Sequence, residues 1–170
     1  MTERTGSAPE APGLPGEPGV DRRWLRQAIG LSRRCPPSAT AFSVGAIIVS
    51  ADGEVLASGF SRERDPADHA EEVALAKAAG AGCPAGSGAL AAATIYTSLE
   101  PCCRRASRPL PCAELIAAAG VRRVVLAWQE PPLFVPGGGA AWLRGRGVAV
   151  VEIPDLAAEA RAVNAHLMRS

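Results

Sequence analysis

Three side chains that zinc prefers as ligands lie at well-separated positions in this chain, and they constrain how it can fold. They are His69, Cys102 and Cys112, one imidazole and two thiols. A zinc ion bound by all three would hold these positions together, so the fold must bring them to one point. Three protein ligands leave one tetrahedral position open, which is typical of a catalytic site and not of a closed structural one.

Glu71, two residues after the histidine, is not needed as a ligand and is available to carry protons. On a helix its side chain would point roughly 200° away from that of His69, so one can bind the metal while the other reaches a bound water. Zinc lowers the pKa of such a water to about 7. His-x-Glu followed by Pro-Cys and a second Cys is also the signature of zinc deaminases that act on nucleobases. We therefore predict a zinc-dependent hydrolytic deaminase with Glu71 as its catalytic residue.

Each part of this pattern is weak when taken alone, because His-x-Glu arises by chance and buried free cysteines are common. The parts gain weight from their order and from a proline directly before both cysteines, each at an expected helix start. Cys103 is an alternative ligand at the same place. We prefer Cys102 because Pro101-Cys102 directly follows a strand, and we interpret Cys35 and Cys83 as ordinary thiols.

The composition is that of one ordinary globular domain, with 48% hydrophobic and 21% charged residues in a chain of 170. The sequence has no apolar run of about 18 residues and no apolar core near its N-terminus, so we expect neither a membrane span nor a signal peptide. Five cysteines without a secretion signal indicate a reducing compartment, and we expect a cytoplasmic protein. Residues 1–19, rich in Pro, Gly and Glu, are predicted to be a disordered tail, and residues 20–170 a single zinc deaminase domain.

Local patterns predict alternating strands and helices. Apolar spacing indicates a first helix with Asp21 as its N-cap, ended by Pro36. Asp52-Gly53 indicates a hairpin between strands at 44–49 and 55–60. Asp68 is the expected N-cap of a helix that ends near residue 80, and a loop is expected over residues 80–92. The later elements are predicted as strands at 94–99, 122–128 and 148–153 and helices at 112–119, 140–146 and 155–168.

Helices separate strands two and three, three and four, and four and five, and such crossovers favour parallel pairing. We therefore predict a three-layer α/β/α fold with a mixed five-stranded sheet. The sheet is expected to be parallel except for one hairpin strand, with strands 4 and 5 parallel. The histidine and both cysteines then lie at helix N-termini at one end of the sheet, where open α/β sheets bind ligands.

Seven short stretches together carry a family resemblance. They are His69-Ala70-Glu71-Glu72, Ser98-Leu99-Glu100-Pro101-Cys102, Pro111-Cys112, Ser43-Val44-Gly45-Ala46, Trp128-Gln129-Glu130-Pro131, Leu133-Phe134-Val135 and Ala162-Val163-Asn164. The chain resembles the cytidine-deaminase-like superfamily over roughly residues 22–168, and within it the diaminopyrimidine deaminases of riboflavin biosynthesis. The resemblance implies Zn²⁺ as cofactor, a small aminopyrimidine as substrate and a homodimer or larger assembly.

The spacing of the cysteines departs from many members of the superfamily. Nine residues separate Cys102 from Cys112 where many members have two, and this length is similar to that of fungal-type riboflavin deaminases. Phe42-Ser43 stands where the bacterial bifunctional form usually carries Asn-Pro. That form also has a reductase domain, for which we expect no room in 170 residues. The fungal-type resemblance implies a ribitylamino diaminopyrimidinone 5′-phosphate as substrate.

Candidate substrate-binding residues lie close to the expected metal. Arg104, Arg105 and Arg108 follow Cys102, and at least one is predicted to bind a substrate phosphate, since the guanidinium matches phosphate oxygens. A solvated loop with incidental charge is the alternative. Phe42 and Ala70 are further candidates for the pocket, although Phe42 is also suited to the core.

Three other functions remain open from the sequence. The substrate could be dCMP, cytosine or another small heterocycle. A deaminase that edits nucleic acid would need a basic surface with aromatic residues, and a net charge of +1 with 4% aromatic residues argues against it. A non-catalytic zinc module would have no use for Glu71. We therefore expect a small-molecule aminopyrimidine as the partner, and neither nucleic acid nor a membrane.

Overall fold

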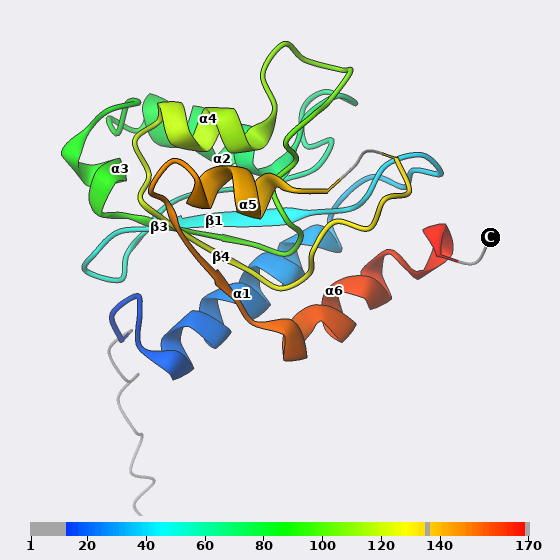
Figure 1. Cartoon of the computed structure of the whole chain (residues 1–170), viewed down its shortest axis with the longest axis horizontal. Helices are drawn as coiled ribbons and strands as arrows, with labels where there is room; N and C mark the ends of the chain where they lie inside the picture. The colour runs from blue at the N-terminus through cyan, green and yellow to red at the C-terminus, as the bar shows by residue number, and fades with distance from the viewer. Residues whose placement is uncertain (1–12, 135–136, 169–170) are drawn as a thin grey trace, which may run out of the picture.

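The computed structural model describes residues 13–134 and 137–168 (Figure 1). Most of the predicted tail therefore lies outside the described residues, although helix α1 begins inside its last two positions, with Pro18 as the first helical residue. The helices and strands, with two short 3₁₀ turns, are α1 Pro18–Ser32, β1 Gly45–Val49, β2 Val55–Phe60, α2 Ala70–Gly80, α3 Gly88–Ala92, β3 Thr94–Thr97, α4 Cys112–Ala118, β4 Arg123–Leu126, α5 Gly139–Arg144, β5 Ala149–Glu152, η1 Pro154–Leu156, α6 Ala157–Val163 and η2 Ala165–Leu167.

The five strands form one mixed sheet in the order β2-β1-β3-β4-β5. Strand β1 is antiparallel to both β2 and β3, whereas β3 pairs with β4, and β4 with β5, in parallel. Four strands thus run in one direction and β1 runs against them. The predicted mixed sheet, with one reversed hairpin strand and with strands 4 and 5 parallel, is confirmed.

Helices cover both faces of this sheet, as Figure 1 shows. Helix α1 packs against β1 and β3 and contacts α6 on one face. Helix α2 packs against β1 and β2 on the other face, where it contacts α4, and α4 in turn contacts α5. The predicted three-layer α/β/α arrangement is therefore confirmed. The four co-directional strands end at the same edge of the sheet, so the loops that follow β2, β3 and β4 meet there.

Both predictions of an aspartate as the N-cap of a helix are wrong. Helix α1 has Glu17 as its N-cap, and Asp21 lies one turn into the helix with its side chain buried. Helix α2 has His69 as its N-cap. The carboxylate of Asp68 instead accepts hydrogen bonds from the backbone N–H groups of Arg64 and Asp65, at 3.1 and 3.0 Å, which closes the turn before the helix.

Two further expectations about helices needed correction. The loop expected over residues 80–92 contains the short helix α3, where the Ser87 side chain accepts from Leu90 N at 3.3 Å. The expected last helix is broken into α6 and flanking 3₁₀ turns. The break falls at Asn164, where the side-chain amide accepts from Ser43 N at 2.7 Å and donates to Ser43 O at 3.1 Å. No helix among the described residues is both long and apolar enough to span a bilayer.

A buried ion pair connects α1 with the middle of the sheet. Asp21 accepts from the Arg123 guanidinium at 2.6 and 3.0 Å and from the Tyr96 hydroxyl at 2.6 Å. Burial by itself would raise the pKa of Asp21, but the hydrogen bonds from Arg123 and Tyr96 outweigh it and hold that pKa below its usual value. The Asp21 carboxylate therefore stabilises the folded state when it is ionised.

We expect Asp21→Asn to lower the free energy of unfolding by about 3 kcal/mol at pH 7, because it leaves Arg123 without its buried counter-ion. A carboxyl with a lowered folded-state pKa contributes stability above its unfolded pKa, about 4, and this contribution is lost as the pH falls below that value. Urea unfolding between pH 3 and pH 7 measures both effects, and the variant should show the weaker pH dependence. Asp155→Asn, at an exposed ion pair with Arg22, is the matched control and should change stability far less, because solvent screens that pair.

Candidate zinc site

The three predicted ligands converge at the end of the sheet where β2, β3 and β4 stop. His69 precedes α2, Cys102 follows β3, and Cys112 is the first residue of α4. Their ligand atoms all lie within 4.8 Å of one another, and both sulfurs are buried. His69 Nδ1 is 3.6 Å from Cys102 Sγ and 3.5 Å from Cys112 Sγ. These three residues are therefore positioned to bind a metal ion.

The spacing of these atoms fits tetrahedral zinc. Zinc–nitrogen and zinc–sulfur bonds of about 2.05 and 2.3 Å at a tetrahedral angle place N and S about 3.6 Å apart, close to the distances found here. The Cys112 backbone N–H donates to Cys102 Sγ at 3.3 Å. A hydrogen bond from Cys112 lowers the pKa of the Cys102 thiol to about 4, although burial opposes its ionisation. The hydrogen bond with Cys102 and burial raise the pKa of the Cys112 thiol, so the thiolate form that zinc binds is favoured at Cys102 and not at Cys112.

Cys103 points elsewhere. Its sulfur contacts the carbonyl oxygen of Gly137 at 3.6 Å, and it is not part of the ligand cluster found among the described residues.

Glu71 is buried in the first turn of α2, with 3% of its surface exposed. The Thr97 hydroxyl at the end of β3 donates to Glu71 Oε1 at 2.7 Å. Burial raises the pKa of Glu71, and the Thr97 hydrogen bond opposes this. The same hydroxyl lies 3.0 Å from Leu99 O, to which it can donate when Glu71 carries a proton. Thr97 therefore suits a carboxyl that gains and loses a proton at a fixed position.

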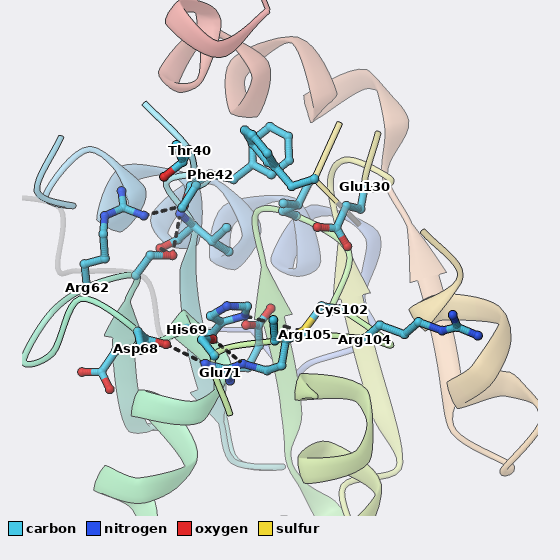
Figure 2. A pocket seen from close by; sticks show the side chains of 18 of the residues that line it. Thr40, Phe42, Arg62, Asp68, His69, Glu71, Cys102, Arg104, Arg105 and Glu130 are labelled. Atoms are coloured by element: carbon cyan, nitrogen blue, oxygen red, sulfur yellow. Dashed lines mark hydrogen bonds between the residues drawn. The ribbon is translucent and has the colours of Figure 1, made fainter. Parts of the chain in front are cut away.

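A cavity of about 300 Å³ opens over these residues, and Figure 2 shows its lining. His69, Glu71 and Cys102 form its floor, and Phe42 lies in its wall. The Phe42 ring packs edge-on against Trp128 and Phe134, with ring centroids 5.5 and 5.1 Å away, so it belongs to both core and pocket. Ala70, the first residue of α2, is fully buried in the core and is not among the lining residues.

The three arginines have different surroundings. Arg105 lines the cavity but is buried, and its guanidinium is paired with Glu72 and with Ala67 O. Arg108 pairs with Asp65, Asp68 and Glu72 and does not line the cavity. Arg104 lines the cavity rim, and Figure 2 shows its guanidinium extending away from the metal ligands. Arg104 is thus the arginine of the three with the greatest freedom to meet a substrate.

The cavity is also lined by charged residues that were not predicted from the sequence as site residues, among them Glu130 and Arg62. In the sequence, Glu130 stands out only as part of the stretch Trp128-Gln129-Glu130-Pro131 that carries the family resemblance. In the structure it lines the cavity, and one of its carboxylate oxygens is buried without a hydrogen-bond partner. Burial, with repulsion from Cys102 and Glu100, raises the pKa of Glu130 to about 8.

Arg62, at φ 60°, donates to Pro36 O, Phe42 O and Ser43 Oγ and so fixes the loop that carries Phe42. The structural signal that marks Arg62 is its positive φ, which is uncommon for a residue other than glycine and cannot be read from the sequence.

Glu100 organises the other wall of the cavity. Its buried carboxylate accepts backbone N–H groups from Glu130 at 2.9 Å, Gly138 at 3.3 Å and Ala140 at 2.8 Å. Gly139 approaches so closely that a Cβ there would lie 1.7 Å from Pro101 O. The segment that holds Glu130 over the cavity is therefore fixed directly to the turn that carries Cys102.

Comparison with known proteins agrees with this geometry. Residues 18–128 match the family described as the cytidine and deoxycytidylate deaminase zinc-binding region. The chain belongs to this family. Its zinc-binding motifs are the segments whose ligand atoms converge here, so Zn²⁺ is the metal that the site holds.

Relatives within this deaminase family include enzymes of riboflavin biosynthesis. The diaminohydroxyphosphoribosylamino-pyrimidine deaminase of Schizosaccharomyces pombe is 34% identical over 136 residues, which cover 80% of this chain and 33% of that protein. The riboflavin biosynthesis protein RibD of Escherichia coli is 39% identical over 108 residues, 64% of this chain and 26% of that protein. The chain thus spans about a third or less of the length of these relatives.

Solved structures show the same fold. RibD of Acinetobacter baumannii, at 31% identity, superposes with a TM-score of 0.67 over 85% of this chain and 38% of that one. A Rib2 deaminase of Aspergillus oryzae, at 24% identity, gives a TM-score of 0.71 over 84% of this chain and 89% of that one. The second likeness concerns the fold alone.

The choice between adjacent cysteines can be tested directly. We expect Cys102→Ser to lose stoichiometric zinc, because a hydroxyl replaces a thiolate ligand. Cys103→Ser should retain it. Elemental analysis of both purified variants after dialysis measures the difference. Equal zinc loss in the two variants, or loss only in Cys103→Ser, would contradict the assignment.

Proposed function

We propose that this chain is a zinc-dependent hydrolytic deaminase that removes an exocyclic amine from a pyrimidine-type nucleotide. The observation that carries the proposal is the position of Glu71, a buried carboxyl that lines the same cavity as His69 and Cys102, two of the three residues positioned to bind zinc. A purely structural zinc site would gain nothing from a buried carboxyl at that place, and burying one is costly. We assign His69, Cys102 and Cys112 as the ligands and Glu71 as the catalytic residue.

The residues of the site can divide the work of hydrolysis. Bound zinc supplies a Lewis acid that lowers the pKa of water to about 7. Glu71 takes a proton from the attacking water and delivers it to the ring nitrogen next to the amine-bearing carbon. Glu71 then passes the second proton of that water to the amine, which leaves as ammonia as the carbonyl forms. Thr97 holds the Glu71 carboxyl at one position through both transfers.

The substrate we favour is a riboflavin-pathway diaminopyrimidine 5′-phosphate, and specifically the ribitylamino diaminopyrimidinone 5′-phosphate. The names of the relatives support this substrate class. So does the lining of the cavity, which offers aromatic surface at Phe42 and a carboxyl at Glu130 for ring amines. Arg104 lines the cavity and is exposed, which supports it as the residue that meets the phosphate of the substrate. Arg105 and Arg108 are less suited to this role because carboxylates already occupy them.

We also propose that residues 20–170 form a single zinc deaminase domain that assembles as a homodimer in the cytoplasm. The continuity of one sheet from β1 to β5 supports one domain. The family resemblance supports the assembly. Five cysteines, of which two serve a metal site, suit a reducing compartment.

We expect purified, zinc-loaded protein to release ammonia from the ribitylamino diaminopyrimidinone 5′-phosphate. Cytosine, dCMP, adenine and guanine nucleotides are assayed beside it. Glu71→Gln should retain zinc and fold but lose at least about 10²-fold in kcat, because Gln cannot carry protons. Ammonia release from dCMP alone would move the proposal to that substrate. Full turnover by Glu71→Gln would contradict the mechanism.

We expect Arg104→Ala to raise KM for the phosphorylated substrate about tenfold or more, since it removes a charge-assisted hydrogen bond. The dephosphorylated substrate lacks that bond, so its kcat/KM should be unchanged by the substitution. Arg23→Ala, at an exposed position on α1, is the control. An equal loss on both substrates would show that Arg104 does not bind phosphate.

A further inference from the structure

A group of ion pairs joins the segment around His69 to the excursion between the two cysteines. The centre of this group is Arg105, whose side chain is only 3% exposed. Its guanidinium donates to Glu72 Oε2 at 3.0 Å and to Ala67 O at 2.6 Å. Arg105 comes from the cysteine segment, whereas both partners flank the histidine. Its buried donors therefore cross from one metal-bearing segment to the other.

Glu72 carries this connection to the histidine itself. The same oxygen that accepts from Arg105 also accepts from the backbone N–H of His69, at 3.4 Å. His69 is the N-cap of α2: its carbonyl accepts from Val73 N at 3.1 Å, whereas its N–H has no acceptor within the helix backbone, and the bond to Glu72 supplies one. One carboxylate thus links the guanidinium of the excursion to the backbone of a zinc ligand.

Arg108 adds a second connection on the exposed side. Its guanidinium lies 3.3 Å from Glu72 Oε1 and 3.3 Å from Asp68 Oδ1, and Asp68 is the residue directly before His69. Arg108 is 37% exposed, so its pairs contribute less than those of Arg105. Residues 67, 68 and 72, on both sides of the histidine, are all held from the cysteine excursion.

We propose that Arg105, acting through Glu72, is a positioning residue for the zinc site and not a phosphate ligand. We call this connection the Arg105–Glu72 clasp. It sets the orientation of the His69 imidazole toward the two sulfurs before the metal binds. Hydrogen bonds that orient metal ligands typically change metal affinity by about 10- to 100-fold. The proposal rests on the zinc site of the proposed function but does not depend on any substrate.

The charge of Arg105 does not by itself account for such an effect. Zinc brings two positive charges and can displace at most one proton from each of the two thiols, so the net charge of the thiols and metal stays the same or becomes more positive when the metal enters. The charge of a nearby guanidinium is then neutral to zinc binding or opposes it. A loss of zinc affinity on its removal therefore reports lost positioning.

The test is zinc affinity measured by competition with a chromophoric chelator, without substrate. We expect Arg105→Gln to bind zinc about tenfold or more weakly, and Glu72→Gln to be weakened similarly. The double variant should be no weaker than the more affected single variant, because both substitutions break one connection. Arg104→Gln, the adjacent arginine at the rim, is the matched control and should bind zinc as the unaltered protein does.

Several outcomes would overturn the clasp. They are wild-type zinc affinity in Arg105→Gln, additive losses in the double variant, or an equal loss in Arg104→Gln. If Arg105→Gln fails to fold, Glu72→Gln tests the same connection from the other partner, and unchanged zinc affinity there counts against the clasp. At saturating zinc, Arg105→Gln should recover turnover equally on phosphorylated and dephosphorylated substrate, and a defect confined to the phosphorylated one would restore the phosphate role.

This design separates the clasp from the proposed function. A protein that releases no ammonia, but whose zinc affinity falls in Arg105→Gln and not in Arg104→Gln, would retain the clasp and lose the deaminase assignment. A protein that releases ammonia, but whose zinc affinity is unchanged in Arg105→Gln, would retain the deaminase assignment and lose the clasp.

Discussion

The convergence of one imidazole and two thiols at a single point is the constraint on which the rest of the structure depends. His69 and Cys102 are 33 positions apart, yet their ligand atoms lie 3.6 Å from each other. The sheet makes this possible, because β2 and β3 run in the same direction on either side of β1 and end at the same edge. The reversed strand β1 then contributes Phe42, just before its start, to the same cavity.

Buried carboxyls around this point have different environments, and these set different roles. Glu100 accepts three backbone N–H groups and so shapes the loop. Glu71 has one hydroxyl partner and lies beside the metal-binding residues, at the place that the proposed mechanism gives to a proton carrier. Glu130 lines the cavity and has a buried oxygen without a hydrogen-bond partner, which suits the recognition of a substrate amine that we propose. The number of donors that reach each carboxyl thus differs between the three roles that we propose.

The arginines illustrate how packing assigns partners. Arg104, Arg105 and Arg108 are close in sequence and of the same type, yet Arg104, which lines the cavity, extends away from the metal ligands. Arg105 is buried against Glu72, and Arg108 bridges the acidic residues before α2. A buried guanidinium is stable only when its donors have partners. Two of the three arginines, Arg105 and Arg108, therefore pair with the carboxylates around His69.

The sequence alone determined the ligand types, their order, the hairpin at Asp52-Gly53 and the alternation of strands and helices that gives the mixed sheet. These features follow from local chemistry and periodicity, which are written in neighbouring residues. Only the tertiary structure decided that Asp21 pairs with Arg123 instead of capping a helix, that Arg105 holds Glu72, and that Glu130 faces the cavity. Each of these depends on a partner brought close by packing, as with Asp21 and Arg123, which are 102 positions apart in the chain. A charged side chain at a helix start has several possible local partners, and the fold selects among them by burying it next to a distant one.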